Sequence, residues 1–295
     1  MLNGVLIVVL TFLFSWQSFF ARKYTENYPG ANAADASNIY NIVYGTAIAV
    51  LTFALAGFRF RPSLPTVLLG LVNAAMLTTY NKSLVKASVL GPYSFQMLCL
   101  LSGGILVPML YNMLFMGERL TGVQLLGIAV LIAAIAIMNL QGLSFKGKKP
   151  SRAYFICCIV LFIVNGFYGQ LMNIQQSVMA GAEREEMIMM TYGVTALGVL
   201  AAMLRRPADL KAGFRMGKKS ALFAAGACLV ATTAANLLVY LISVMESVTV
   251  LFAIDNGGVM LLSALYSIFL FKEKATPSQL IGMGLSILSI VLLSI

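Results

Sequence analysis

The sequence contains no histidine and only four cysteines. The cysteines lie inside apolar runs and lack the spacing of metal ligands, so we interpret them as packing residues and predict no metal site. A Gly-x-x-x-x-Gly-Lys-Ser/Thr motif is also missing, which leaves ATP-driven pumping by this chain unsupported. No acid, base and nucleophile converge in a motif, so we predict neither an enzyme nor a bound cofactor. The four cysteines are Cys99, Cys157, Cys158 and Cys228.

Charged residues are scarce as well. They make up 10% of the 295 residues, whereas 60% are hydrophobic and the mean hydropathy is +0.91. Soluble domains carry roughly a quarter charged residues, so this chain has too few to cover a water-facing surface. Its apolar residues fall in runs of about 20, the length that spans a bilayer core of about 30 Å. We therefore predict an all-α protein embedded in the lipid bilayer of the cell membrane.

The apolar runs predict ten transmembrane helices joined by short connections. The first run, 1–16, lacks the basic n-region of a signal peptide, so we interpret it as a membrane helix rather than a cleaved signal. The longest predicted connections are 24–37, 141–152 and 205–219, which leaves no soluble domain, and any site must lie between helices. The predicted spans are about 3–21, 38–57, 65–84, 89–115, 120–140, 153–176, 187–204, 219–241, 247–271 and 276–295.

The basic residues are distributed unevenly between the two sides of the membrane. Of the 20 Lys and Arg, 16 fall in the odd-numbered connections. The positive-inside rule then places those connections in the cytoplasm and both termini outside. This clustering in short gaps also explains the net charge of +10 without a nucleic-acid partner.

The second half of the chain repeats the first at an offset of 155 residues from the third predicted helix onward. Chance similarity of apolar sequence would match Leu and Ile, but not polar residues and glycines in register. Five helices are an odd number, so the second copy enters the membrane from the opposite side, and we predict two inverted five-helix repeats, 1–145 and 146–295, with a site near mid-membrane at their interface. The matched pairs include Thr78 and Thr233, Asn81 and Asn236, Gly103 and Gly258, Tyr111 and Tyr266, Glu118 and Glu273, Thr121 and Thr276, Gln124 and Gln279, and Gly127 and Gly282.

The segment 117–127, Gly-Glu-Arg-Leu-Thr-Gly-Val-Gln-Leu-Leu-Gly, resembles a motif of the drug/metabolite transporter superfamily in its ten-helix, EamA-like branch. A second copy lies at 272–282, and Ser15-Trp16 resembles the first-helix Trp of that family. The resemblance implies two EamA-like repeats and secondary transport of a small solute. Many relatives have basic residues near a cytoplasmic N-terminus, whereas 1–20 has none.

The paired glutamates of this motif have a local physical explanation. Thr121 with Gln124, and Thr276 with Gln279, have the spacing of a capping box at a helix N-terminus. Glu118 and Glu273 lie just before these helices, where negative charge is favoured. We therefore interpret both glutamates as structural turn residues in preference to transport groups.

Asp255 is the clearest candidate for a transport group. It lies about eight residues into the ninth predicted helix, roughly 12 Å deep at 1.5 Å per residue, and its counterpart in the first repeat is Leu100. Ionisable groups inside a membrane are costly and mark function by default. We predict a proton-coupling group or a counter-ion for an amine, against the alternative of a structural carboxylate bonded to a neighbouring helix. Asn256 follows it directly.

Lys82 and Lys86 lie four residues apart and share one helical face. They suit an anion or an acid across the bundle, although snorkelling to the cytoplasmic interface at the end of the third helix explains them better. Glu246, at the start of the ninth helix, is predicted to be an exposed interfacial charge.

Polar and aromatic side chains gather in the predicted helices 1–4 and 6–9, which we expect to line a cavity, with helices 5 and 10 as peripheral supports. Trp16, Tyr44, Tyr80 and Tyr93 could form an aromatic wall that suits an amine, or simply pack together. The predicted pathway comprises Trp16, Gln17, Tyr44, Tyr80, Asn81, Lys82, Tyr93, Gln96, Asn165, Tyr168, Asn236, Asp255 and Asn256.

Helix 4 contains Pro108, which should kink it, with Gly103 nearby. Gly103, Pro108 and, in the second repeat, Gly258 are therefore predicted hinges between inward-open and outward-open states.

We predict a secondary transporter of a small metabolite, driven by a proton or substrate gradient, with amino acids or related amines favoured. The alternative is a non-transporting membrane component, such as a subunit of a lipid-carrier flippase. A closed polar cavity would favour the transporter, and an apolar cavity that opens laterally would favour the alternative.

Overall fold

The computed structural model describes residues 2–29, 33–91, 93–139, 151–270 and 276–295. Over these residues the chain is helical and contains no strand, which confirms the all-α prediction. The helices are α1 (Leu2–Asn27), α2 (Ala33–Leu55), α3 (Leu64–Leu90), α4 (Tyr93–Phe115), α5 (Gly122–Asn139), α6 (Arg152–Val178), α7 (Arg184–Met203), α8 (Pro207–Gly213), α9 (Lys218–Val244), α10 (Val248–Phe269) and α11 (Pro277–Leu293).

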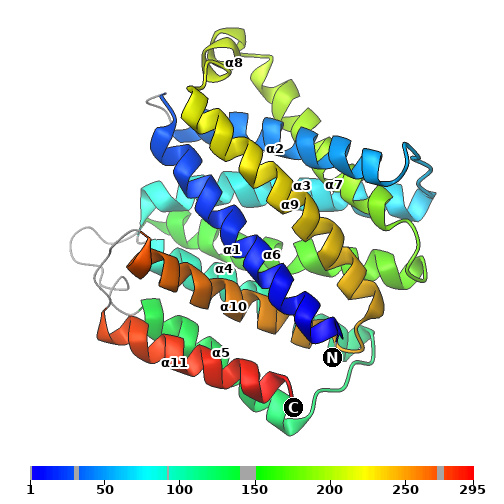
Figure 1. The fold of residues 1–295 in the computed structure, drawn as a ribbon, viewed down its shortest axis with the longest axis vertical. Coiled ribbons are helices and arrows are strands. Elements are labelled where there is room, and N and C mark those ends of the chain that lie inside the picture. The colour runs from blue at the N-terminus through cyan, green and yellow to red at the C-terminus, as the bar shows by residue number, and fades with distance from the viewer. Residues whose placement is uncertain (1, 30–32, 92, 140–150, 271–275) are drawn as a thin grey trace. The chain divides into compact units, whose positions relative to one another are not determined.

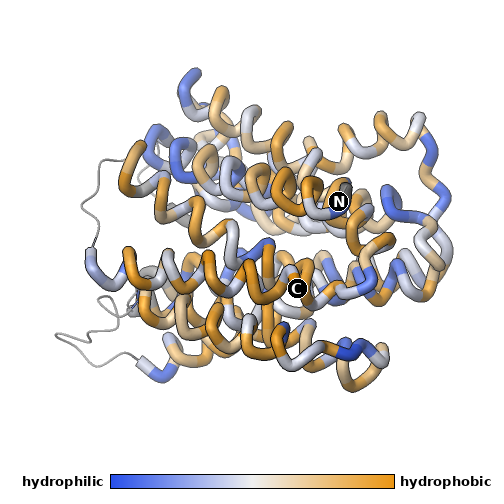
Figure 2. Tube along the Cα trace, turned by 60° about the horizontal axis from the view of Figure 1, so that its bottom comes forward, coloured by the Kyte–Doolittle hydropathy of each residue, from blue (hydrophilic) through white to orange (hydrophobic). Residues whose placement is uncertain are grey.

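Eight of these helices are long and apolar enough to cross a membrane, which indicates a multi-pass membrane protein. Figure 2 shows the apolar colouring that runs along them. The eight do not include α11, which has 17 residues, or α3, which carries Asn73, Asn81, Lys82 and Lys86 along its length. Ten spans, their inversion and the side of each terminus therefore stay predictions. The helices that qualify are α1, α2, α4, α5, α6, α7, α9 and α10.

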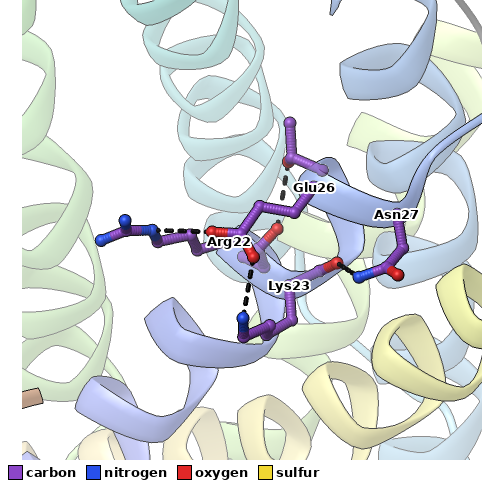
Figure 3. Close-up of polar contacts among 6 residues, drawn as sticks. Arg22, Lys23, Glu26 and Asn27 are labelled. Atoms are coloured by element: carbon purple, nitrogen blue, oxygen red, sulfur yellow. Dashed lines mark hydrogen bonds and ion pairs between the residues drawn. The ribbon is translucent and has the colours of Figure 1, made fainter. Parts of the chain in front are cut away.

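Helix α1 continues to Asn27, beyond the end predicted near residue 21, and this corrects the expected connection 24–37. Glu26 accepts hydrogen bonds from Arg22 Nε at 3.1 Å and from Lys23 Nζ at 2.8 Å, and Asn27 Nδ2 donates to the carbonyl of Lys23 at 2.8 Å (Figure 3). Pairs three and four residues apart support a helix. Arg22, Lys23 and Glu26 therefore belong to the last turns of α1 and not to a loop.

Two other boundaries also differ from the prediction. The short helix α8 occupies part of the connection predicted at 205–219; Pro207 lies at its first position, Asp209 in its first turn and Lys211 in its last, all favoured placements. Helix α3 runs to Leu90, so Lys82 and Lys86 lie within it. The predicted connection 141–152 lies almost entirely outside the described residues.

The chain divides into two compact units. Unit 1 comprises Met1–Phe12, Lys82–Gln170 and Met245–Ile295, and unit 2 comprises Leu13–Asn81 and Leu171–Val244. Each unit takes helices from both 1–145 and 146–295. The two compact units therefore do not coincide with the predicted repeats, 1–145 and 146–295. The repeats themselves stay a prediction.

In unit 1, α5 packs along α11, and α4 packs against α5 and α10 (Figure 1). Glycines permit the close approach of α5 and α11. A Cβ added to Gly127 would lie 3.0 Å from Cγ of Leu293, and one added to Gly282 would overlap the Met138 side chain. Ser289 Oγ donates to the Gly127 carbonyl at 2.8 Å. Small residues at such contacts give membrane helices their van der Waals packing.

In unit 2, α2 packs against α7, α8 and α9. Gly45 of α2 lies against the backbone of α7, where an added Cβ would come within 2.7 Å of the Tyr192 carbonyl oxygen. A buried apolar cluster holds the two helices together beyond this contact. Its members are Ile39, Ile42, Val199 and Met203.

Candidate functional site

Asp255 is the eighth residue of α10, and its side chain is buried with 8% exposure. Thr11 Oγ1, in the first half of α1, donates to Asp255 Oδ1 at 3.3 Å. Within the described part of the chain, no Lys or Arg lies within ion-pair distance of this carboxylate. A hydroxyl group therefore faces the carboxylate without supplying a balancing charge.

Asn256 and Gly258, which follow Asp255 on α10, lie against small or polar groups of unit 1. An added Cβ at Gly258 would overlap the Thr11 side chain, and one at Gly104 of α4 would lie 2.7 Å from Asn165 Nδ2 and 3.1 Å from Asn256 Oδ1. The glycines thus leave room for the amide groups of α6 and α10 beside α4. The structure brings the predicted pathway residues Asn165, Asn256 and Asp255 into one unit.

Both amides are tied to helix backbones. Asn165 Nδ2 donates to the Leu100 carbonyl at 2.9 Å, and Asn256 Nδ2 donates to the Phe252 carbonyl at 2.8 Å. Leu100 is the repeat counterpart of Asp255, so the polar contact at that position in α4 involves a backbone oxygen in place of a carboxylate.

The other predicted pathway residues of unit 1 differ in burial and in their contacts. Gln96 is buried, and its Nε2 donates to the Leu84 carbonyl at 3.0 Å. Tyr168 is half-buried and Lys82 is exposed. Although Tyr93 begins α4, its side chain lies outside the described part. Lys82 and Lys86 are both exposed on α3, and Glu246 is exposed before α10.

Four predicted pathway residues form hydrogen bonds in unit 2. Gln17 Nε2 donates to the Tyr44 hydroxyl at 2.6 Å. Asn81 Nδ2 donates to Oδ1 of Asn41 at 3.0 Å, joining α3 to α2. Asn236 Nδ2 donates to Oγ1 of Thr52 at 3.0 Å, joining α9 to α2.

The four residues of the predicted aromatic wall have different surroundings. Trp16 contacts Phe19 and Phe20 on its own helix, with centroid separations of 5.9 and 5.5 Å. Tyr44 instead contacts Tyr40 and Tyr192. Tyr80 is half-buried on α3. The wall itself stays a prediction, whereas the tyrosine contacts of α2 were missed.

The predicted hinge residues lie at helix contacts in unit 1. An added Cβ at Gly103 would overlap the backbone of Phe162 in α6, just as one at Gly258 would overlap Thr11 of α1. Pro108 is buried within α4, which continues as one helix on both sides of it. These positions are packed tightly, and their role in bending stays a prediction.

Glu118 reaches across unit 1 to the N-terminus of α10. It accepts hydrogen bonds from the Ser247 hydroxyl, from the Thr249 backbone N–H at 3.3 Å and from Thr249 Oγ1 at 2.9 Å. Asn112 Nδ2 donates to Thr249 Oγ1 at 3.1 Å, and Gln170 Nε2 donates to Asn112 Oδ1 at 2.7 Å. This network fixes the start of the helix that carries Asp255.

Both predicted capping boxes are confirmed. Thr121 and Gln124 exchange hydrogen bonds of 3.0 and 3.2 Å, and Thr276 and Gln279 exchange bonds of 2.9 and 3.3 Å. The second predicted turn residue, Glu273, lies outside the described residues.

Sequence reasoning missed Glu183, which precedes α7. Its carboxylate accepts from both the backbone N–H and the hydroxyl of Ser63 at 2.9 Å, at the start of α3. Burial alone would raise the pKa of Glu183, but hydrogen bonds from Thr66 and from Ser63 outweigh it and hold that pKa below its ordinary value. No motif in the sequence pairs these segments, which are 120 residues apart.

A groove lies in unit 2, between α2 and α9. Its volume is about 400 Å³ and its lining is apolar throughout. This apolar lining is one of the two features expected of the flippase-type alternative, the other being a lateral opening. The lining residues are Val43, Ala47, Leu51, Met216, Ala221, Ala224, Ala225, Cys228 and Leu229.

No family model and no curated protein match this sequence. The chain is similar to a solved structure described as "Crystal structure of protein", with a TM-score of 0.71 and 14% identity. The similarity covers 98% of this chain and 96% of that one. At this identity the likeness shows a shared fold over the full length and nothing about activity.

Proposed function

We propose that this protein is a secondary active transporter of a small metabolite, and that Asp255 is its coupling group. The observation that carries the proposal is a carboxylate buried in α10 whose described partner is the neutral hydroxyl of Thr11. A charge at the centre of a membrane helix costs about 2.5–3.5 kcal/mol even on the more lenient scales. Binding a proton or an ammonium group would remove this cost, and alternating access would then link its release to movement of the solute.

The internal repeat supports alternating access. Gly127 lies against Leu293, and Gly282 lies against Met138. Adding 155 to 127 gives 282 and adding 155 to 138 gives 293, so the repeat offset relates the first-half residue of each contact to the second-half residue of the other. Likewise, Gly103 meets α6 and its counterpart Gly258 meets α1, the first helix of the other half. A two-fold relation between inverted repeats would produce such reciprocal contacts, and two such repeats can exchange conformations around a central site.

A second candidate function is that of a non-transporting membrane component, such as a subunit that assists a lipid-carrier flippase. The apolar groove between α2 and α9 favours it, because an alkyl chain needs no polar partner. Asp255 would then be a structural carboxylate, held by Thr11.

Uptake into liposomes tests the proposal. The purified protein would first be screened for amines and amino acids that raise its melting temperature, and each stabilising solute would then be offered to proteoliposomes with and without a pH gradient. A transporter should accumulate at least one solute faster than protein-free liposomes do, with a rate that the gradient changes. A protein that binds or moves labelled lipid, but takes up none of these solutes, would support the second candidate instead.

A further inference from the structure

Five tyrosines form a continuous column of rings in unit 2. Neighbouring ring centroids lie 5.5 Å apart for Tyr28 and Tyr24, 5.1 Å for Tyr24 and Tyr40, 5.2 Å for Tyr40 and Tyr44, and 5.9 Å for Tyr44 and Tyr192. The rings come from α1, α2 and α7 and from the residue that follows α1. Such a cluster of π-systems favours a cation over an anion in its surroundings.

Most hydroxyl groups in this column have partners. Tyr24 donates to the Ala36 carbonyl at 3.1 Å, and Tyr28 donates to the Gly213 carbonyl at 3.2 Å. The Tyr44 hydroxyl accepts from Gln17. The hydroxyl groups of Tyr24, Tyr28 and Tyr44 are thus hydrogen-bonded within the protein.

Two buried oxygens beside the centre of the column are not satisfied. The Tyr40 hydroxyl and Gln17 Oε1 have no hydrogen-bond partner within the described part of the chain. They belong to one group of side chains, because Gln17 is bonded to Tyr44 and the Tyr44 ring stacks on Tyr40 with an interplanar angle of 22°. A buried polar group without a partner is costly and calls for an explanation, such as a ligand.

The apolar groove lies next to Tyr40 along α2. Tyr40, Val43 and Ala47 are spaced three and four residues apart and so share one face of that helix. Val43 and Ala47 line the groove. On the opposite wall, Ala224 and Met216 line the groove and also belong to the cluster in which Tyr40 packs. Tyr40 therefore packs beside the wall of this apolar surface, with its hydroxyl buried.

We propose that this surface binds an amphiphilic primary amine, with its ammonium N–H groups donating to the Tyr40 hydroxyl and Gln17 Oε1 and its apolar body in the groove. A primary ammonium has three N–H donors, enough for both oxygens. Within the described lining no cationic side chain is present to pair with a carboxylate or phosphate, which disfavours amino acids and phospholipids. The proposal rests on the proposed transport function and narrows its solute to amines without a carboxylate.

Binding measurements on the intact protein in phosphatidylcholine nanodiscs test the subsite without any gradient. The probe is phenethylamine, compared with its N,N,N-trimethyl analogue, which keeps the charge but has no N–H, and with phenylalanine, which adds a carboxylate. Phenethylamine should bind at least tenfold more tightly than either comparator. Equal affinity for all three would overturn the proposal.

Two substitutions test whether the Tyr40 hydroxyl and Gln17 Oε1 accept the hydrogen bonds of the ammonium group. Tyr40→Phe and Gln17→Met should each weaken phenethylamine binding about ten- to one-hundredfold, because each removes an acceptor for a charged donor. Tyr24→Phe is the matched control: it should leave affinity within twofold but lower the melting temperature, because its hydroxyl has a partner. Tyr40→Phe should not lower the melting temperature, since its hydroxyl has none. Wild-type affinity in Tyr40→Phe would refute the assignment.

Two further arms separate related explanations. If phosphatidylethanolamine nanodiscs abolish phenethylamine binding, the oxygens hold a lipid headgroup and the choice of a free amine is wrong. If phenethylamine binds through Tyr40 but neither it nor any other stabilising solute is taken up, the transport function is contradicted while the subsite stands. Uptake of another solute, without phenethylamine binding, would support the transport function and contradict the amine subsite.

Discussion

Removing the Glu118 carboxylate should destabilise unit 1 through the start of α10. Glu118→Ala leaves the Ser247 hydroxyl and the Thr249 backbone N–H and hydroxyl without their acceptor. A hydrogen bond to a charged group is worth about 1.5–3 kcal/mol, and a negative charge at a helix N-terminus about 0.3–1 kcal/mol. Because water or Asn112 can replace part of this, we expect a loss of about 2–4 kcal/mol, and about half of that for Glu118→Gln, which keeps one acceptor oxygen.

The assay is reversible unfolding of the purified protein in mixed micelles, with Glu246→Ala as the matched control. Glu246 also precedes α10 but is exposed, so its replacement should change stability by less than about 0.5 kcal/mol. A double-mutant cycle with Thr249→Val should give a coupling energy of about 1 kcal/mol or more. If Glu118→Ala costs no more than Glu246→Ala, Glu118 does not anchor α10 and the reasoning fails.

Two other predictions concern stability. The pKa of Glu183 is depressed in the folded protein, so its contribution to stability is present above the ordinary carboxyl pKa of 4.5 and is lost as pH falls through the lower folded value. Glu183→Gln should therefore flatten the acid limb of a curve of stability against pH. An acid limb unchanged by Glu183→Gln would contradict this prediction. On α11, Gly282→Ala should destabilise by about 1–3 kcal/mol because the new methyl meets Met138, whereas Gly284→Ala, with open space around it, should be neutral or stabilising by up to about 1 kcal/mol. Equal effects at the two glycines, measured by thermal unfolding, would refute the close packing of α5 and α11.

The sequence predicted the helices well because each apolar run is bounded by polar residues and because the capping boxes mark where α5 and α11 begin. It failed at the end of α1, where Arg22, Lys23 and Glu26 resemble a loop in composition but pair with one another on a helix. It also missed α8, whose few residues carry no apolar periodicity.

Contacts between distant segments were beyond prediction. Asp255 stood out as an unmatched charge, but its partner Thr11 is 244 residues away and is an ordinary polar residue in an apolar run. The cap that Glu118 provides to α10 was hidden for the same reason. Of the tyrosine column, Tyr40 and Tyr44 left a visible trace because they lie four residues apart on a predicted helix, whereas Tyr24 and Tyr28 fall in the predicted connection 24–37.

The most direct test of the proposed mechanism compares wild type and Asp255→Asn in proteoliposomes. Asparagine keeps the size of the side chain and the contact with Thr11 but cannot exchange a proton. With a transported solute in hand, uptake driven by a pH gradient and exchange of labelled for unlabelled solute would be measured side by side. We predict that Asp255→Asn loses gradient-driven accumulation while retaining exchange. Full pH-driven accumulation by Asp255→Asn would contradict the assignment of Asp255 as the coupling group.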